Sequence, residues 1–422
     1  MPGHKGKSLI GIEHLDITEI EGADSLYEAS GIIAESEREA SALFGSETYY
    51  STEGSSLCIR AMIHLACVHA RARGENPLLL AGRNAHKAFH SAAALLDVDV
   101  EWLVPNDMHN YLSCEISAEY LSKYLEKCDK KPTALYVTSP DYLGNVADIK
   151  ELADVCHKYG MLLIVDNAHG AYLRFLSPSQ HPMDLGADIC CDSAHKTLPV
   201  LTGGAYLHLG NGVKDELGSL VKDSMLLFGS TSPSYLVLQS LDKANEYLEG
   251  YKDRLACFIN KVDALKNVLK ENGYLLYGNE PLKITIFAKS CGYYGYELAK
   301  KLSEKGMICE FADPDFVTLM LTPENEDDID AIERILLSIE NRDAILEAAP
   351  TFSRAVRAMS LREACLSPFE TVSVEQSKGR IASLSTVGCP PAVPIIISGE
   401  IVDEKAIECF KYYGIDKINI VK

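Results

Sequence analysis

The stretch MLLIVDNAHGA at residues 161–171 decides the fold class of this chain of 422 residues. Its opening residues form a continuous apolar run, which is the pattern of a strand buried on both faces of a parallel sheet. The run ends at Asp166, and the next such run, DICCDSAHKT at 188–197, carries Lys196 at its end. Ligands of open parallel sheets bind at the carboxyl ends of the strands, so both residues are candidates for a functional site.

Segments of the same two kinds alternate on both sides of this pair. Strand-like runs occur at 77–82, 98–104, 134–140 and 203–209, with a short extended piece at 48–51. Helix-like segments occur at 31–43, 54–72, 85–96 and 148–160. This alternation predicts an α/β fold with a mostly parallel, doubly wound sheet.

The pattern changes after about residue 245. A long helix-like stretch at 233–272 leads to three strand-like pieces, at 282–288, 308–313 and 316–322. These pieces predict a smaller α+β domain after the large one. We expect an N-terminal arm over 1–30, a large domain over 31–245, a small α+β domain over 246–345 and a C-terminal domain over 346–422.

The composition narrows the class of partner. The chain has 40 basic and 60 acidic side chains and a formal charge of −20, which argues against nucleic acid and anionic membranes as main partners. Its 13 cysteines form no CxxC pair, which is typical of a reduced, cytoplasmic protein. No apolar run approaches the roughly 20 residues of a membrane span. We therefore expect a cytoplasmic protein that acts on a small molecule.

Lys196 and Asp166 suit the chemistry of pyridoxal 5'-phosphate (PLP). A lysine can form an imine with this cofactor, and a carboxylate can keep the pyridine nitrogen protonated, so that the ring accepts electrons. Neighbouring strands would present both residues at one edge of the sheet. The alternatives are a solvated surface lysine and a carboxylate that caps a neighbouring element.

Two other segments could complete such a site. Gly54, Ser55 and Ser56 open a helix-like segment, where backbone N–H groups and the positive end of the helix dipole can bind a phosphate. His86 follows another strand and could stack on a flat cofactor. Each segment could instead be a simple helix cap. We expect no metal, because His86 and His90 lack the glutamate of the zinc-protease pattern.

Eight segments, in order along nearly the whole chain, resemble the bacterial Orn/Lys/Arg decarboxylases. They are MPGHKG at 1–6, STEGSS at 51–56, GRNAHKA at 82–88, YVTSPDYLGNVADI at 136–149, IVDNAHGA at 164–171, DSAHKTLPVLTGGAYLH at 192–208, GSTSPSYLVLQSLD at 229–242 and GRIASLSTVGCPPAVPIIISGE at 379–400. The members of this family are PLP enzymes with the aspartate-aminotransferase fold, so the resemblance implies that fold and that cofactor.

The resemblance also implies roles for individual residues. Lys196 would carry the cofactor as a Schiff base, Asp166 would pair with the pyridine nitrogen, and His86 would stack on the ring. The other expected contacts are Gly54, Ser55 and Ser56 at the phosphate with Ser193 and His195 beside it, Ala168 and His169 near the ring, and Thr231 or Ser232 at the phosphate of a neighbouring subunit. Lys196, His195 and His169 form the expected catalytic set, and a homodimer or larger assembly is implied.

The sequence departs from the family pattern at several positions. Ala88 stands where the family usually has serine, Leu384 where it usually has glutamate, and Cys389 within a variant of the family's PYPPG. Glu53 precedes Gly54 where the family has a small NG turn. Family members also usually have a segment before MPGHKG, so we expect either a trimmed start or a short form without the fused regulatory domain.

Three hypotheses about function follow. The first is decarboxylation of lysine, ornithine or arginine to the amine and CO2. The second is another PLP-dependent reaction of an amino acid, such as transamination or elimination. The third is a PLP-binding protein that has lost catalysis. The sequence does not choose among the three basic amino acids.

Overall fold

A mostly parallel, seven-stranded sheet occupies the first half of the chain in the computed structural model, which describes residues 2–105, 110–352, 354–384 and 390–422. Its strands, in their order across the sheet, are β1 (Glu47–Ser51), β7 (Ala205–Leu209), β6 (Ile189–Asp192), β5 (Leu162–Asp166), β4 (Ala134–Thr138), β2 (Leu78–Gly82) and β3 (Asp99–Leu103). The strands from β6 to β3 run parallel, and β7 is antiparallel to both of its neighbours. The predicted α/β fold is confirmed.

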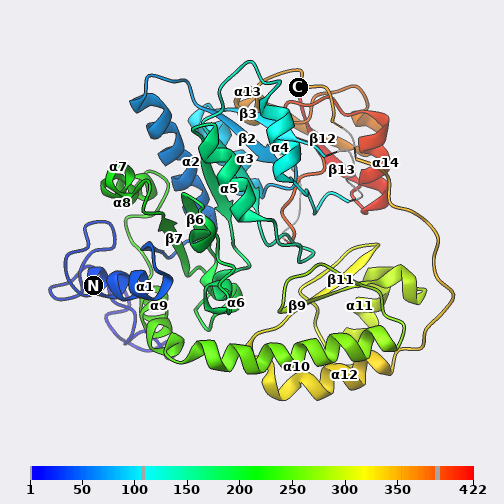
Figure 1. The fold of residues 1–422 in the computed structure, drawn as a ribbon, viewed down its shortest axis with the longest axis horizontal. Helices are drawn as coiled ribbons and strands as arrows, with labels where there is room; N and C mark the ends of the chain where they lie inside the picture. The colour runs from blue at the N-terminus through cyan, green and yellow to red at the C-terminus, as the bar shows by residue number, and fades with distance from the viewer. Residues whose placement is uncertain (1, 106–109, 353, 385–389) are drawn as a thin grey trace.

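Helices cover both faces of this sheet (Figure 1). Successive side chains of a strand point to opposite faces, so β2 contributes to two cores. Leu79 and Ala81 pack with α2 (Gly54–Ala72) and α3 (Lys87–Leu96), and Leu80 packs with α4 (Ala118–Leu125) and α5 (Ile149–Lys158). Because both faces are covered, β2 has no exposed residue, which explains its continuous apolar run.

The helix-like stretch at 233–272 forms two helices, not one. They are α9 (Tyr235–Leu248) and α10 (Tyr251–Glu271). Gly250 separates them with a φ of 66°, a left-handed conformation that glycine adopts readily and that a right-handed helix cannot contain. Helix α10 leads from the first sheet to the second, along the lower edge of Figure 1.

The second sheet is antiparallel and has four strands. In their order across the sheet they are β10 (Phe311–Ala312), β11 (Phe316–Met320), β9 (Lys283–Phe287) and β8 (Leu276–Tyr277). Of the strand predicted at 308–313, only the two residues of β10 pair with a neighbour. Helices α11 (Gly295–Glu304) and α12 (Ile329–Leu337) accompany this sheet.

A third, two-stranded sheet lies near the C-terminus. Strands β12 (Phe369–Ser373) and β13 (Lys417–Val421) pair antiparallel, with α13 (Leu361–Leu366) and α14 (Glu404–Tyr412) beside them in sequence. The sequence did not predict this strand pair. The remaining helices outside the sheets are α1 (Ile32–Phe44), α6 (Ala194–Thr197), α7 (Lys214–Leu217) and α8 (Val221–Leu226).

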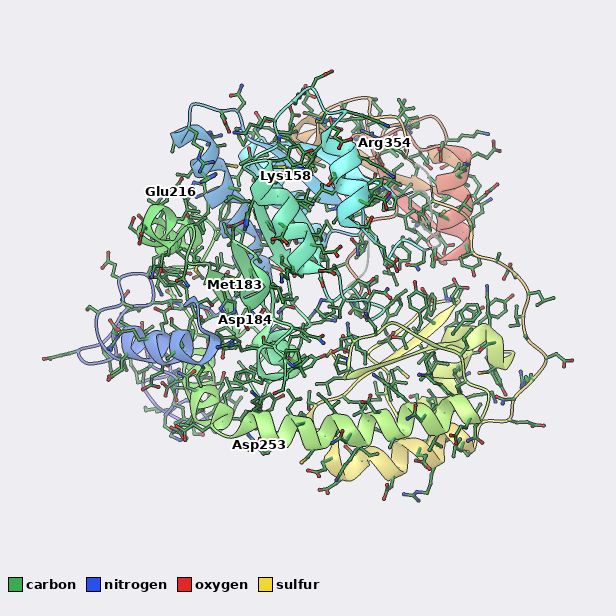
Figure 2. The ribbon with its side chains drawn as sticks, viewed as in Figure 1. Lys158, Met183, Asp184, Glu216, Asp253 and Arg354 are labelled. Atoms are coloured by element: carbon green, nitrogen blue, oxygen red, sulfur yellow. The ribbon has the colours of Figure 1, made fainter. Side chains whose placement is uncertain are left out.

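Charged side chains are spread over separate elements of the surface. Figure 2 labels Lys158 on α5, Glu216 on α7 and Asp253 on α10, all exposed. Every cysteine within the described ranges has a free thiol. Among the described residues, no helix has both the length and the apolar character needed to cross a membrane.

Candidate active site

A cavity of about 300 Å³ lies where the carboxyl ends of the parallel strands meet. The expected residues that line it are Gly54, Ser55, Ser56, His86, Asp166, Ala168, His169, Ser193, His195 and Lys196. Thr231 and Ser232 are exposed and do not line it in the single chain. Their contact with a neighbouring subunit stays a prediction.

Lys196 and His169 form the closest polar contact within this cavity. Lys196 lies on α6, four residues beyond the end of β6, so it does not end the strand itself. Its Nζ atom is 2.6 Å from Nε2 of His169. Burial lowers the pKa of His169 well below its usual value, and the positive charge of Lys196 lowers it further. His169 is therefore neutral and can accept a hydrogen bond from the lysine.

Asp166 is the last residue of β5 and is buried. Its Oδ2 atom accepts a hydrogen bond of 2.9 Å from the Tyr136 hydroxyl group, and its Oδ1 atom accepts one of 3.2 Å from the backbone of Ala168. Burial raises the pKa of Asp166, whereas the Tyr136 hydroxyl and the charge of Lys196 oppose that rise. A buried carboxylate at a cavity is stabilised by a cationic partner, and a protonated pyridine nitrogen is one.

The N-terminus of α2 faces the same cavity. Gly54, its first residue, has a φ of 72°, and the preceding residue, Glu53, makes no side-chain cap for the helix. The hydroxyl group of Ser193 donates a hydrogen bond of 2.9 Å to Ser55 Oγ. An uncapped helix start with hydroxyl groups beside it is suited to a phosphate group.

His86 both caps a helix and lines the cavity. Its Nδ1 atom accepts a hydrogen bond of 3.1 Å from the backbone N–H of Ala88 at the start of α3. Burial lowers the pKa of His86 to about 4, so its ring is neutral. The capping interpretation and the stacking interpretation are thus compatible, because the capping bond uses one nitrogen and leaves the ring face beside the cavity.

The residues present fit PLP part by part. Lys196 offers an amine for its aldehyde, Asp166 a carboxylate for its ring nitrogen, His86 an imidazole for its ring face, and the start of α2 a place for its phosphate. The same cavity contains a neutral imidazole, His169, within hydrogen-bond distance of the amine.

Sequence reasoning missed three features of the site. Tyr136 anchors Asp166, and Tyr142 lines the cavity with its ring centroid 5.0 Å from that of His169. Pro391 and Val393, far along the chain, also line it. The two tyrosines lie within the segment 136–149 that carries the family resemblance, but no spacing within the sequence shows which of its side chains reach the cavity.

Of the departures from the family pattern, Glu53 lines the cavity, whereas Ala88 and Leu384 do not. Ala88 is buried in α3, and Leu384 is 42% exposed. Neither lines the cavity, and Cys389 lies outside the described residues. A buried group of potential metal ligands, formed by His181, Cys190 and Asp192, is separate from it.

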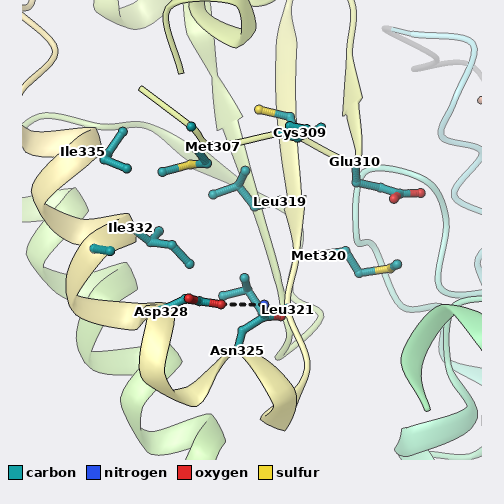
Figure 3. Close-up of a pocket in the computed structure, with 13 residues that line it drawn as sticks. Met307, Cys309, Glu310, Leu319, Met320, Leu321, Asn325, Asp328, Ile332 and Ile335 are labelled. Atoms are coloured by element: carbon teal, nitrogen blue, oxygen red, sulfur yellow. Dashed lines mark hydrogen bonds between the residues drawn. The ribbon is translucent and has the colours of Figure 1, made fainter. Parts of the chain in front are cut away.

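A second cavity, of about 450 Å³, lies between α12 and the second sheet and contains none of the expected site residues. Figure 3 shows Met307, Leu319 and Ile332 directed into it. The side chain of Glu310 points away from these apolar groups. Its lining also includes Cys309, Glu310 and Asp328 but, among the residues that the structure describes, no lysine that could bind a cofactor as an imine.

Comparisons with known proteins give a consistent result. The family models of the Orn/Lys/Arg decarboxylase major domain and C-terminal domain match residues 10–285 and 346–416. The protein YaaO of Bacillus subtilis is 30% identical over 418 residues, covering 93% of this chain and 84% of YaaO. An arginine decarboxylase of the same species is 29% identical, covering 96% of this chain and 88% of that protein.

Solved structures show the same fold. Lysine decarboxylase A from Pseudomonas aeruginosa superposes with a TM-score of 0.80 at 17% identity, covering 100% of this chain and 78% of that one. The lysine decarboxylase LdcF of Francisella novicida gives a TM-score of 0.79 at 16% identity, with coverage of 100% and 78%.

Proposed function

The chain belongs to the Orn/Lys/Arg decarboxylase family and is a decarboxylase, and on this basis we propose that it releases the α-carboxyl group of a basic amino acid as CO2, with PLP held by Lys196. The observation that carries the proposal is the meeting of Lys196, His169 and Asp166 in one cavity at the carboxyl ends of the parallel strands. The substrate is lysine, ornithine or arginine.

The cofactor would be held at four points. Lys196 would bind it covalently, Asp166 would face the ring nitrogen, His86 the ring, and the backbone of Gly54–Ser56 the phosphate. When bound, PLP supplies an electron sink for the pair of electrons that the Cα–carboxylate bond leaves behind. Asp166 maintains the sink by holding a proton on the ring nitrogen, and the Tyr136 hydrogen bond keeps the carboxylate aimed at it.

The side chains around Lys196 would move the protons. Neutral His169 accepts a hydrogen bond from Lys196 Nζ and would take up a proton from the ammonium group, which leaves the free amine that attacks a carbonyl carbon. After CO2 has left, a proton must return to Cα. Lys196, His169 and His195 are the groups in the cavity that could deliver it.

Exposed residues of this chain support a proposal that two copies associate. Leu9 and Ile10 of the N-terminal arm are 89% and 78% exposed, and Thr231 and Ser232 are exposed as well. Exposed apolar residues of this kind are buried when subunits associate. We include a homodimer in the proposal, with Thr231 or Ser232 of one subunit at the cofactor phosphate of the other.

Release of CO2 and amine from purified, PLP-loaded protein tests this function. Lysine, ornithine and arginine are offered separately, with the Lys196→Ala variant as control. The proposal expects one amine to be released, and its release to be abolished in the variant. If none of the three is decarboxylated while the cofactor stays bound, the reaction is a different one, such as transamination, or the protein binds PLP without catalysis.

A further inference from the structure

A basic amino acid has a distal positive charge, and the groups at the cofactor site leave it without a partner. Glu53 lines the cavity, but it lies at the phosphate end and accepts a hydrogen bond of 2.6 Å from the backbone of Ser230. Asp166 faces the ring nitrogen. The partner of the distal cation must therefore come from another acidic residue near the cavity.

Two deeply buried acidic residues nearby are already saturated. Asp141 accepts hydrogen bonds of 2.9, 2.9 and 2.7 Å from the backbone of Leu143 and from the backbone and side chain of Asn145. Glu280 accepts hydrogen bonds from the Tyr172 hydroxyl group and from the backbone of Lys283. Their oxygens hold the polypeptide together and are not available to a ligand.

Glu310 is different. It is half-buried, precedes β10, and lines the cavity beside α12, not the cofactor cavity itself. Its Oε1 atom accepts a hydrogen bond of 3.3 Å from the Tyr142 hydroxyl group, and within the described ranges its side chain makes no other hydrogen bond and no ion pair. Figure 3 shows its carboxylate turned away from the apolar cavity on that sheet.

Tyr142 connects Glu310 with the reacting groups. The ring of Tyr142 lines the cofactor cavity, and its centroid lies 5.9 Å from Lys196 Nζ and 5.0 Å from the His169 ring. Its hydroxyl group, at the far end of the ring, reaches Glu310. The Tyr142 ring therefore connects the reacting groups with the Glu310 carboxylate.

One cation already lies in this region. Lys283 Nζ is 5.9 Å from the Tyr142 ring centroid, but it is buried and donates a hydrogen bond of 2.8 Å to the backbone oxygen of Asp141. Lys283 is held by that bond and makes no ion pair with Glu310 within the ranges that the structure describes, although the charge of Glu310 opposes the lowering of the Lys283 pKa by burial. The Glu310 carboxylate is thus left for a ligand.

We propose that Glu310 binds the distal ammonium or guanidinium group of the substrate, and that the substrate side chain runs along the Tyr142 ring. This inference rests on the proposed function. It also accounts for a departure in the sequence, because Leu384, which stands at the position of the usual family glutamate, is largely solvent-accessible and does not line the cavity. Glu310 supplies a carboxylate from a different segment.

Stable adducts of the cofactor with amino acids test this assignment without catalysis. The reduced phosphopyridoxyl adducts of lysine, ornithine, arginine and the neutral norleucine are titrated into cofactor-free protein by calorimetry. We expect one basic adduct to bind about 10- to 100-fold more tightly than the norleucine adduct, as a charged hydrogen bond allows. In Glu310→Gln this preference should disappear, whereas affinity for the norleucine adduct stays the same.

Glu304→Gln is the matched control, because it removes the same charge from an exposed position on α11. It should keep the preference for the basic adduct. If Glu310→Gln keeps the preference too, or the unaltered protein has none, the assignment of Glu310 is wrong. Failure of the proposed function has a different signature: no basic amino acid is decarboxylated, whatever the adducts show.

Discussion

The Tyr136 hydroxyl group donates a hydrogen bond of 2.9 Å to Oδ2 of Asp166, across the neighbouring parallel strands β4 and β5. Both side chains are buried, and the bond lowers a carboxyl pKa that burial raises. In Tyr136→Phe we therefore expect the pKa of Asp166 to rise further, and the cofactor to bind about 3- to 10-fold more weakly, as the loss of one hydrogen bond predicts. Fluorescence titration with PLP measures this affinity.

Asp166→Asn should have a larger effect, because it removes the charge that would hold a proton on the ring nitrogen. We expect turnover to fall by about 10- to 100-fold, and by more than in Tyr136→Phe, since a charged hydrogen bond is worth about 1.5–3 kcal/mol. Steady-state kinetics of both variants give the comparison. Equal turnover in Asp166→Asn and the unaltered protein would contradict the role given to this carboxylate.

Gly54 offers a test of the phosphate site with an internal control. Gly54 and Gly74 lie near the two ends of α2, both have a φ of 72°, and an added Cβ would meet nothing within 4 Å at either. Alanine at either position should cost about 1–2 kcal/mol of stability, because both need a left-handed backbone. Only Gly54→Ala should weaken the binding of PLP or inorganic phosphate.

Equal losses of phosphate affinity in the two glycine variants would show that strain, and not the position of Gly54, is responsible. The parallel stability measurement by urea unfolding separates these causes.

His90 makes folding stability depend on pH. Burial lowers its pKa to about 3, while its ring stacks on Trp102 with centroids 4.8 Å apart. Below about pH 6.5 the unfolded chain binds a proton that the folded protein excludes, so stability falls as the pH decreases towards the folded pKa. Between pH 7 and 5 this should cost on the order of 2 kcal/mol, and His90→Asn should remove that part of the dependence. Urea unfolding at both pH values measures it, with exposed His14→Asn as control.

Asp192, the last residue of β6, forms a buried hydrogen-bond network with two histidines. Its Oδ2 atom accepts hydrogen bonds of 3.0 and 3.1 Å from His181 and His208, and all three side chains are fully buried. Burial alone would raise the pKa of Asp192, but the two imidazoles lower it below its usual value. The contribution of Asp192 to folding stability is therefore fully present above the pKa that the carboxyl group has in the unfolded chain. It is lost as the pH falls through the pKa of Asp192 in the folded protein.

We expect Asp192→Asn to destabilise the protein by about 3–5 kcal/mol, as breaking a buried charged network does. Asp184, labelled in Figure 2, forms a partly exposed ion pair with Arg174. Asp184→Asn breaks this pair and should lower the free energy of unfolding by no more than about 1 kcal/mol. Thermal unfolding of the two variants compares them. Equal losses would mean that the Asp192 network contributes no more than a surface pair.

The sequence predicted the sheet well because its strands are buried on both faces, and such strands have a recognisable apolar run. Asp166 follows this rule, since it is the polar end of such a run. The break at Gly250 was missed because the flanking segments share helical spacing. The pair β12–β13 was missed because eight of its ten residues are exposed or half-exposed and have no distinctive pattern, and only contact between distant segments defines the two strands.

In the site too, contacts between distant segments could not be predicted from the sequence. Lys196, Asp166 and His86 follow strands and could be predicted, because strand order alone brings them to one edge. Glu310 and Tyr142 could not, because they meet only when the second sheet packs against the first. No spacing in the sequence relates residue 142 to residue 310.

The proposed function requires that Lys196 is the lysine that binds the cofactor. Treating the PLP-loaded protein with sodium borohydride fixes the link between cofactor and lysine, and peptide mass spectrometry then locates it. We predict that the modified lysine is Lys196. Modification of Lys283 instead, a buried lysine beside Tyr142 whose pKa burial lowers to about 8, would contradict the assignment.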